Sequence, residues 1–284
     1  EDIMKKLQNK KDIDFETSAN MCFNVIRYIL RIEFVKIKKR KVTFLIISLV
    51  LIFSPLFFTR DIYAADVSWD GEGGDNNWET AANWSTESVP GADDKVTIDS
   101  NVTVNINSST TINSLTLGNS GGSTSPTLNF AYDALAGDGD PLVIDDSDLT
   151  VYSGATITHS AASIGEVING RINIDVQTGD TLIAGSINAN GKGYTGTSSE
   201  TDGEGPGAGK GAWEASGAGY GGSGNTSSDV AGGGVYGSFI NPTHLGSSGG
   251  GGGGSIGGDG GGAITLIVNG TLTLSGSVTA DGLM

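Results

Sequence analysis

Two segments, RINIDVQTGDTLIAGSINANG (171–191) and AITLIVNGTLTLSGSVTADG (263–282), share one pattern of apolar and polar residues. Three apolar pairs align at an offset of 92: Ile172 with Ile264, Ile174 with Leu266, and Val176 with Val268. After a one-residue gap the match resumes at Gly185 and Gly276, at an offset of 91. Self-similar strand units of about 20 residues are typical of solenoids, in which each turn of chain covers the next. We therefore expect the two segments to lie side by side in parallel register.

Other short runs also alternate apolar and polar residues between tight turns. The runs with this period are VTID (Val96–Asp99), VTVNIN (Val102–Asn107), SLTL (Ser114–Leu117), LTVYSGATITH (Leu149–His159), RINIDV (Arg171–Val176) and AITLIV (Ala263–Val268). A period of two predicts strands with one buried face. No stretch after residue 65 keeps a helical period, so the sequence predicts an all-β fold. We interpret it as a right-handed parallel β-helix, with a β-sandwich as the alternative.

Composition divides the chain into zones. We expect an N-terminal extension or translated upstream sequence (1–34), a signal peptide (35–65), a tryptophan-rich N-terminal cap (66–95), β-solenoid coils (96–190), a glycine-rich loop insertion (191–262) and a further, truncated coil (263–284). The insertion holds 29 of the 46 glycines. It also holds Tyr194, Trp213, Tyr220 and Tyr236, and such anchors are uncommon in flexible linkers. We therefore expect a loop that leaves one coil and returns to the next, with glycine allowing close backbone packing.

The basic zone near the N-terminus has the plan of a secretory signal. KIKKRK (Lys36–Lys41) precedes an apolar run (Val42–Phe58) and a small-residue exit, which predicts cleavage after Ala64 or Ala65. A transmembrane anchor is the alternative, but this run is marginal for about 30 Å of hydrocarbon. We expect a secreted or cell-surface protein of bacterial type that meets the membrane only through this segment during export.

Charge and cysteine usage exclude several kinds of partner. Residues 66–284 carry 4 Lys or Arg and 25 Asp or Glu, so that part repels nucleic acid and anionic lipid. The one cysteine, Cys22, precedes the predicted cleavage site, so the exported part has no disulfide or cysteine ligand. GEGPGAGKGA (203–212) departs from the phosphate-loop pattern at two required positions, so we expect no nucleotide.

The stretch WDGEGGDNNWETAANW (69–84) holds three of the four tryptophans, Trp69, Trp78 and Trp84. The first coil of a solenoid exposes apolar core and unpaired strand edges, which must be covered. Large aromatic side chains can do this over a few residues, so we interpret the three as a structural cap. The alternative is an exposed platform for sugars, for which Trp213 is a better candidate.

The same region carries a recognisable motif. Its elements are Trp69-x-Gly71, Trp78, Asn83-Trp84, Pro90-Gly91 and Asp94-x-Val96-x-Ile98. This resembles the W-G…W…NW…P…D-x-V-x-I pattern at the start of large secreted bacterial β-helix proteins, including autotransporter passengers and adhesin-like surface proteins. The glycine-rich zone and the segment after it resemble repeats in such proteins. The resemblance covers roughly 66–110 and 185–284; it implies export, a β-solenoid and surface display, and it identifies no catalytic residue.

No stretch has the pattern of a catalytic or cofactor site. Asp138, Asp140, Asp145, Asp146 and Asp148 are weak calcium candidates, because the spacing does not match an EF-hand loop and we favour solvated turns as the explanation of these residues. The two histidines, His159 and His244, are expected at the surface or in turns.

The sequence thus predicts an exported, non-enzymatic, adhesin-like β-solenoid segment of a larger protein. We expect no cofactor, apart from the candidate calcium ion. Expected partners are glycans, extracellular matrix or cell-surface components. The alternatives are a polysaccharide-acting β-helix enzyme (a lyase or glycoside hydrolase) and a carbohydrate-binding module. Lyases of this shape need basic residues near acids, and only Lys95, Arg171, Lys192 and Lys210 follow residue 65.

Overall fold

The computed structural model describes residues 65–131, 141–161, 170–228, 230–240 and 242–284. The predicted N-terminal extension (1–34) and all of the predicted signal peptide except Ala65 lie outside these residues. The described part is all-β, and its one helical element is a 3-10 turn, η1 (Ala81–Asn83). No described helix is both long and apolar enough to cross a bilayer.

The strands form three parallel sheets. Sheet 1 contains β1 (Asp66–Ser68), β2 (Lys95–Ile98), β5 (Ser114–Leu117), β8 (Leu149–Val151), β11 (Thr181–Ile183) and β14 (Leu272–Leu274). Sheet 2 contains β3 (Thr103–Ile106), β6 (Thr127–Phe130), β9 (Thr156–His159), β12 (Ser186–Asn188) and β15 (Ser277–Thr279). Sheet 3 contains β4 (Thr110–Ile112), β7 (Leu142–Ile144), β10 (Ile172–Val176) and β13 (Ile264–Val268).

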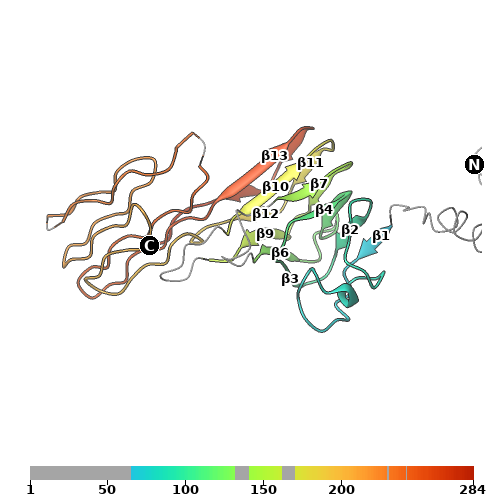
Figure 1. Ribbon diagram of the computed structural model, residues 1–284, viewed down its shortest axis with the longest axis horizontal. Coiled ribbons are helices and arrows are strands. Elements are labelled where there is room, and N and C mark those ends of the chain that lie inside the picture. The colour runs from blue at the N-terminus through green and yellow to red at the C-terminus, as the bar shows by residue number, and fades with distance from the viewer. Residues whose placement is uncertain (1–64, 132–140, 162–169, 229, 241) are drawn as a thin grey trace, which may run out of the picture. The chain divides into compact units, whose positions relative to one another are not determined.

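From β2 onward, successive strands enter sheets 1, 2 and 3 in turn, and each strand pairs with the strand three places along the chain. We call each run of three strands a coil. Every pairing between these named strands is parallel. Figure 1 shows this order for sheet 3, in which β4, β7, β10 and β13 follow one another. The arrangement is consistent with a parallel β-helix, whereas a β-sandwich is built from antiparallel sheets.

The register predicted from the internal repeat is confirmed. β10 and β13 pair in parallel with Ile172 opposite Ile264 and Val176 opposite Val268. β12 and β15 pair in parallel with Ile187 opposite Val278. One strand prediction was too long: the run from Leu149 to His159 divides into β8 and β9. The corner between them includes Gly154 at φ 89°, a left-handed conformation that glycine adopts readily.

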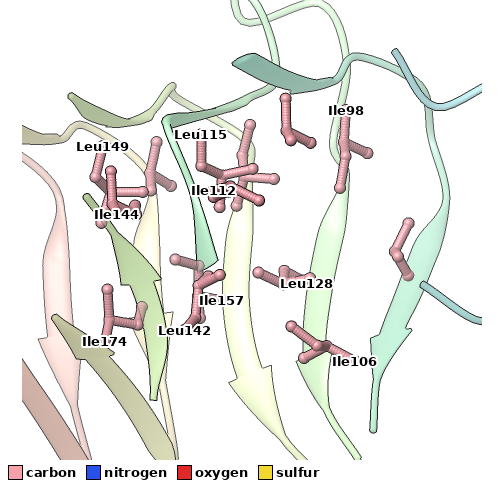
Figure 2. Packing of buried hydrophobic residues seen from close by; sticks show 14 of the residues in the cluster. Ile98, Ile106, Ile112, Leu115, Leu128, Leu142, Ile144, Leu149, Ile157 and Ile174 are labelled. Atoms are coloured by element: carbon pink, nitrogen blue, oxygen red, sulfur yellow. The ribbon is translucent and has the colours of Figure 1, made fainter. Parts of the chain in front are cut away.

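The core lies between the three sheets, as Figure 2 shows. Alternate residues of β2 to β12 are buried and form columns that run through successive coils, such as Val104, Leu128, Ile157 and Ile187 in sheet 2. Burial of each such side chain stabilises the fold by about 1.5–3 kcal/mol. In the last coil the equivalent residues are much more exposed, with Leu272 at 48% and Leu274 at 50%.

Candidate functional site

The three tryptophans of residues 69–84 are buried in the core cluster, with exposed fractions of 8% for Trp69, 1% for Trp78 and 0% for Trp84. The ring of Trp84 meets those of Trp69 and Trp78 edge to face, at centroid distances of 5.0 and 4.7 Å. Its Nε1 donates to the Trp78 carbonyl oxygen at 2.7 Å. Because the rings are enclosed, their faces are not accessible to a sugar.

A polar network holds the loop that carries these rings. The carboxylate of Asp75 accepts hydrogen bonds from the Asn77 N–H, the Asn83 amide and the Thr80 hydroxyl. These bonds, led by that from Asn77, lower the pKa of Asp75, because they favour its charged form. The Asn83 Oδ1 in turn accepts from the Gly73 N–H at 3.0 Å. The network fixes the loop at the start of the sheets.

The same loop covers the first strand of sheet 2. The Trp78 N–H donates to the Asn105 carbonyl at 2.8 Å, and the Asn105 N–H donates to the Asn76 carbonyl at 2.7 Å. The Glu79 carboxylate accepts from the Asn107 N–H at 2.8 Å just after that strand. Backbone groups of β3 that no preceding strand could pair are therefore bonded by the loop, which is the geometry required of a cap.

The structure does not assemble a calcium site from the candidate aspartates that it describes. Asp138 and Asp140 lie outside the described residues, and Asp145, Asp146 and Asp148 are exposed. The Asp148 carboxylate accepts from the Asp180 N–H at 2.8 Å, which joins two successive turns. Within the described ranges, no three His, Cys, Asp or Glu side chains form a group that could hold a metal ion.

The expectation of a surface position for His159 is wrong. Its side chain is fully buried in β9, opposite Phe130, in the inner column of sheet 2. Nε2 accepts from the Ala263 N–H at 3.3 Å, so Nδ1 carries the proton and donates to the Ser160 carbonyl at 2.9 Å. Burial lowers the pKa of His159 to about 4. Neutral His159 therefore accepts a hydrogen bond at Ala263, where the glycine-rich insertion returns to the sheets.

The connections from sheet 2 to sheet 3 differ in length from coil to coil. Sheet 2 is joined to sheet 3 by residues 107–109, 131–141, 160–171 and 189–263 in successive coils. The last connection starts and ends at neighbouring points, since the Gly262 N–H donates to the Ala189 carbonyl at 2.7 Å. In repeat proteins, insertions gathered on one face frequently form the binding surface.

The described residues of the insertion, 191–228, 230–240 and 242–262, form a packed bundle of glycine-rich segments, drawn in Figure 1 as ribbons without arrows. Three segments, 193–196, 246–249 and 257–260, bond to one another through their backbones. Gly193 N–H donates to the Gly260 carbonyl at 2.8 Å, Tyr194 N–H to Gly246 at 2.9 Å, and Gly249 N–H to Gly258 at 2.9 Å. We call the described residues of 191–262 the glycine bundle.

The glycines of the bundle allow this close packing. A Cβ at Gly193, Gly196, Gly257 or Gly260 would lie less than 3.0 Å from backbone atoms of a neighbouring segment. Two pairs of these glycines are three residues apart, which matches the three residues per turn of a polyproline II helix. As at the axis of the collagen triple helix, only glycine fits such positions.

The bundle exposes large hydrophobic side chains. The described residues of this kind that are more than 60% exposed within it are Trp213, Val235, Phe239, Ile240 and Ile256. Among charged residues of the bundle, the Lys210 ammonium donates a hydrogen bond to the Asp202 carboxylate at 2.7 Å and forms an ion pair with it. This hydrogen bond lowers the pKa of the Asp202 carboxyl. The bundle thus combines a hydrogen-bonded backbone with exposed apolar side chains.

A groove of about 830 Å³ lies where the bundle meets the last coil. Inner residues Ile264, Leu266 and Val278 line one part, and Tyr220, His244 and Asp259 line another. His244 is exposed, as expected. Its backbone N–H donates to the Tyr220 hydroxyl at 3.3 Å. Sequence reasoning missed this groove because its walls come from several separate segments between Ala218 and Leu283.

No protein-family model, curated protein or solved structure matches the chain. The functional conclusion therefore rests on the chain's own residues.

Proposed function

We propose that this chain is an exported, non-enzymatic, adhesin-like protein of the bacterial cell surface or medium. The three sheets form a right-handed parallel β-helix that serves as scaffold, and Trp69, Trp78 and Trp84 cap its first coil. The glycine bundle is the part that contacts the partner, a glycan or a matrix or cell-surface component. The basic and apolar run over Lys36–Phe58 directs export.

The observation that carries this proposal is the exposure of large hydrophobic side chains on the bundle. A solvated loop has no need of a tryptophan at its surface, and aromatic residues are enriched where proteins bind partners. The bundle has its own backbone hydrogen bonds, so the backbone that carries these side chains is ordered before binding. Such pre-ordering lowers the entropy lost on binding.

A binding assay with a matched deletion tests this function. Beads coated with the chain are compared with beads that carry a variant lacking 192–262, on surfaces of matrix proteins and immobilised glycans. We expect the chain to adhere and the deletion variant to lose adhesion while keeping its β-type circular dichroism. Equal adhesion by the deletion variant would refute the role of the bundle.

Export and the absence of catalysis are tested separately. N-terminal sequencing of secreted material should find Ala65 or Asp66 as the first residue, whereas membrane-retained protein that keeps Val42–Phe58 would contradict export. Incubation with polysaccharides should release neither reducing ends nor unsaturated products. Release of either would support the polysaccharide-acting alternative instead.

A further inference from the structure

Three turns of the glycine bundle meet around Trp213. They are the turns at 198–201, 212–215 and 252–255. The Gly253 N–H donates to the Trp213 carbonyl at 3.0 Å. The hydroxyl of Ser199 donates to the Gly252 carbonyl at 2.8 Å and accepts from the Gly254 N–H at 2.8 Å. These bonds tie the turns together and fix the backbone of Trp213; we call this place the Trp213 tip.

The indole of Trp213 rests on glycine. A Cβ at Gly253 would lie 2.6 Å from the indole Cε3 and 2.7 Å from Cδ2, so the ring occupies the space of a side chain there. The residue is nevertheless 74% exposed. One face of the ring is thus supported by backbone and the other is open to solvent. This differs from Trp84, whose ring is enclosed by two further indoles.

The surroundings of the ring select for an uncharged ligand. The turns carry hydroxyls and carboxylates, with Ser199, Glu200 and Glu214 exposed among them. The nearby cation, Lys210, is paired with Asp202. An anionic ligand would meet repulsion at this acidic surface. A neutral sugar can place its C–H face on the indole while its hydroxyls bond to the polar side chains around it.

On the basis of the proposed binding function, we infer that the Trp213 tip binds an uncharged saccharide by stacking on the free face of the indole. A stable protein interface buries about 1,200–2,000 Å² around an apolar centre. Three turns made of small, hydroxyl-bearing and acidic residues with one indole suit a sugar ring better than such an interface. A protein partner is therefore an outcome that the test must separate.

Tryptophan fluorescence gives a direct measurement, because the other three tryptophans are buried in the loop at residues 69–84. Acrylamide should quench Trp213 selectively, and binding should protect it. The probes are cellohexaose and chitohexaose, with anionic hexagalacturonate as the control ligand. We expect protection by at least one neutral hexasaccharide and none by the anionic one.

Variants separate stacking from a structural role. Trp213→Ala should weaken saccharide binding by about tenfold or more, and Trp213→Phe should restore part of it, as for stacking sites. The unfolding midpoint should stay unchanged in both. Phe239→Ala, another exposed aromatic of the bundle, is the control and should bind as the parent does.

The outcomes distinguish this inference from the proposed function. If no neutral saccharide protects Trp213 but Trp213→Ala still reduces adhesion to a matrix protein, the saccharide inference is wrong and the binding function stands. If no saccharide protects Trp213 and Trp213→Ala changes neither saccharide binding nor adhesion, the inference is overturned. If, in addition, the deletion of 192–262 leaves adhesion intact, the proposed function fails as well.

Discussion

Replacement of Trp84 by alanine tests whether the tryptophan loop stabilises the sheets. Trp84 is fully buried, packs edge to face on two other indoles, and donates a 2.7 Å hydrogen bond to the Trp78 carbonyl. Removal of a buried tryptophan side chain costs about 3–5 kcal/mol. Each lost aromatic pair is worth about 0.5–1.5 kcal/mol. Part of this pair energy is already included in the cost of removing the side chain. We therefore expect a loss near the upper end, about 4–5 kcal/mol.

The assay is equilibrium unfolding in urea, followed by circular dichroism in the far ultraviolet. Trp213→Ala is the matched control, because the same side chain is removed from an exposed position; it should change stability by no more than about 0.5 kcal/mol. If Trp84→Ala costs less than about 1 kcal/mol, or as little as the control, the loop does not act as a cap.

Deletion of 192–262 should leave the β-type circular dichroism signal intact, because the insertion starts and ends at hydrogen-bonded neighbours. A short loop in its place also lowers the entropic cost of loop closure by about 2–3 kcal/mol. Loss of the β signal would contradict this prediction. The pKa of His159 is about 4 in the folded chain and about 6.5 in the unfolded chain, so the unfolded chain binds more protons between these pH values. The contribution of His159 to stability is therefore complete above pH 6.5 and falls by about 3 kcal/mol towards pH 4. Urea titrations at several pH values should show this fall, and it should shrink in His159→Gln. Thr181→Val should raise the free energy of unfolding by about 1 kcal/mol, since the buried Thr181 hydroxyl has no hydrogen-bond partner among the described residues; a loss of stability would mean that the hydroxyl is satisfied.

The strands and their pairing could be predicted because the information is local. Alternation of Val, Ile and Leu with Thr and Asn identifies a buried face, and the repeat between 171–191 and 263–282 identifies which segments stack. Clustering of Trp69, Trp78 and Trp84 similarly drew attention to the start of the sheets. Element ends were less predictable, since the corner at Gly154 interrupts what reads as one continuous run.

The candidate site was less accessible to sequence reasoning. The burial of His159 depends on its column with Phe130 and on Ala263, which is 104 residues away. Glycine accounts for 29 of the residues in 191–262, so no apolar pattern indicates which segments of the glycine bundle bond together. The support of Trp213 by Gly253 likewise appears only when distant turns are placed side by side.

The most direct test of the account is a set of distances along sheet 1. Thr97, Thr116, Thr150, Leu182 and Thr273 occupy consecutive positions across its strands. Spin labels would be attached to cysteines introduced at Thr97 and at either Leu182 or Thr273, with Cys22 replaced by serine. At about 4.8 Å per strand, the separations should be about 14 and 19 Å respectively. The distances would be measured by dipolar spectroscopy. Stacked parallel coils would be contradicted if the label at Thr273 were closer to Thr97 than the label at Leu182, or if both labels were more than about 30 Å from Thr97.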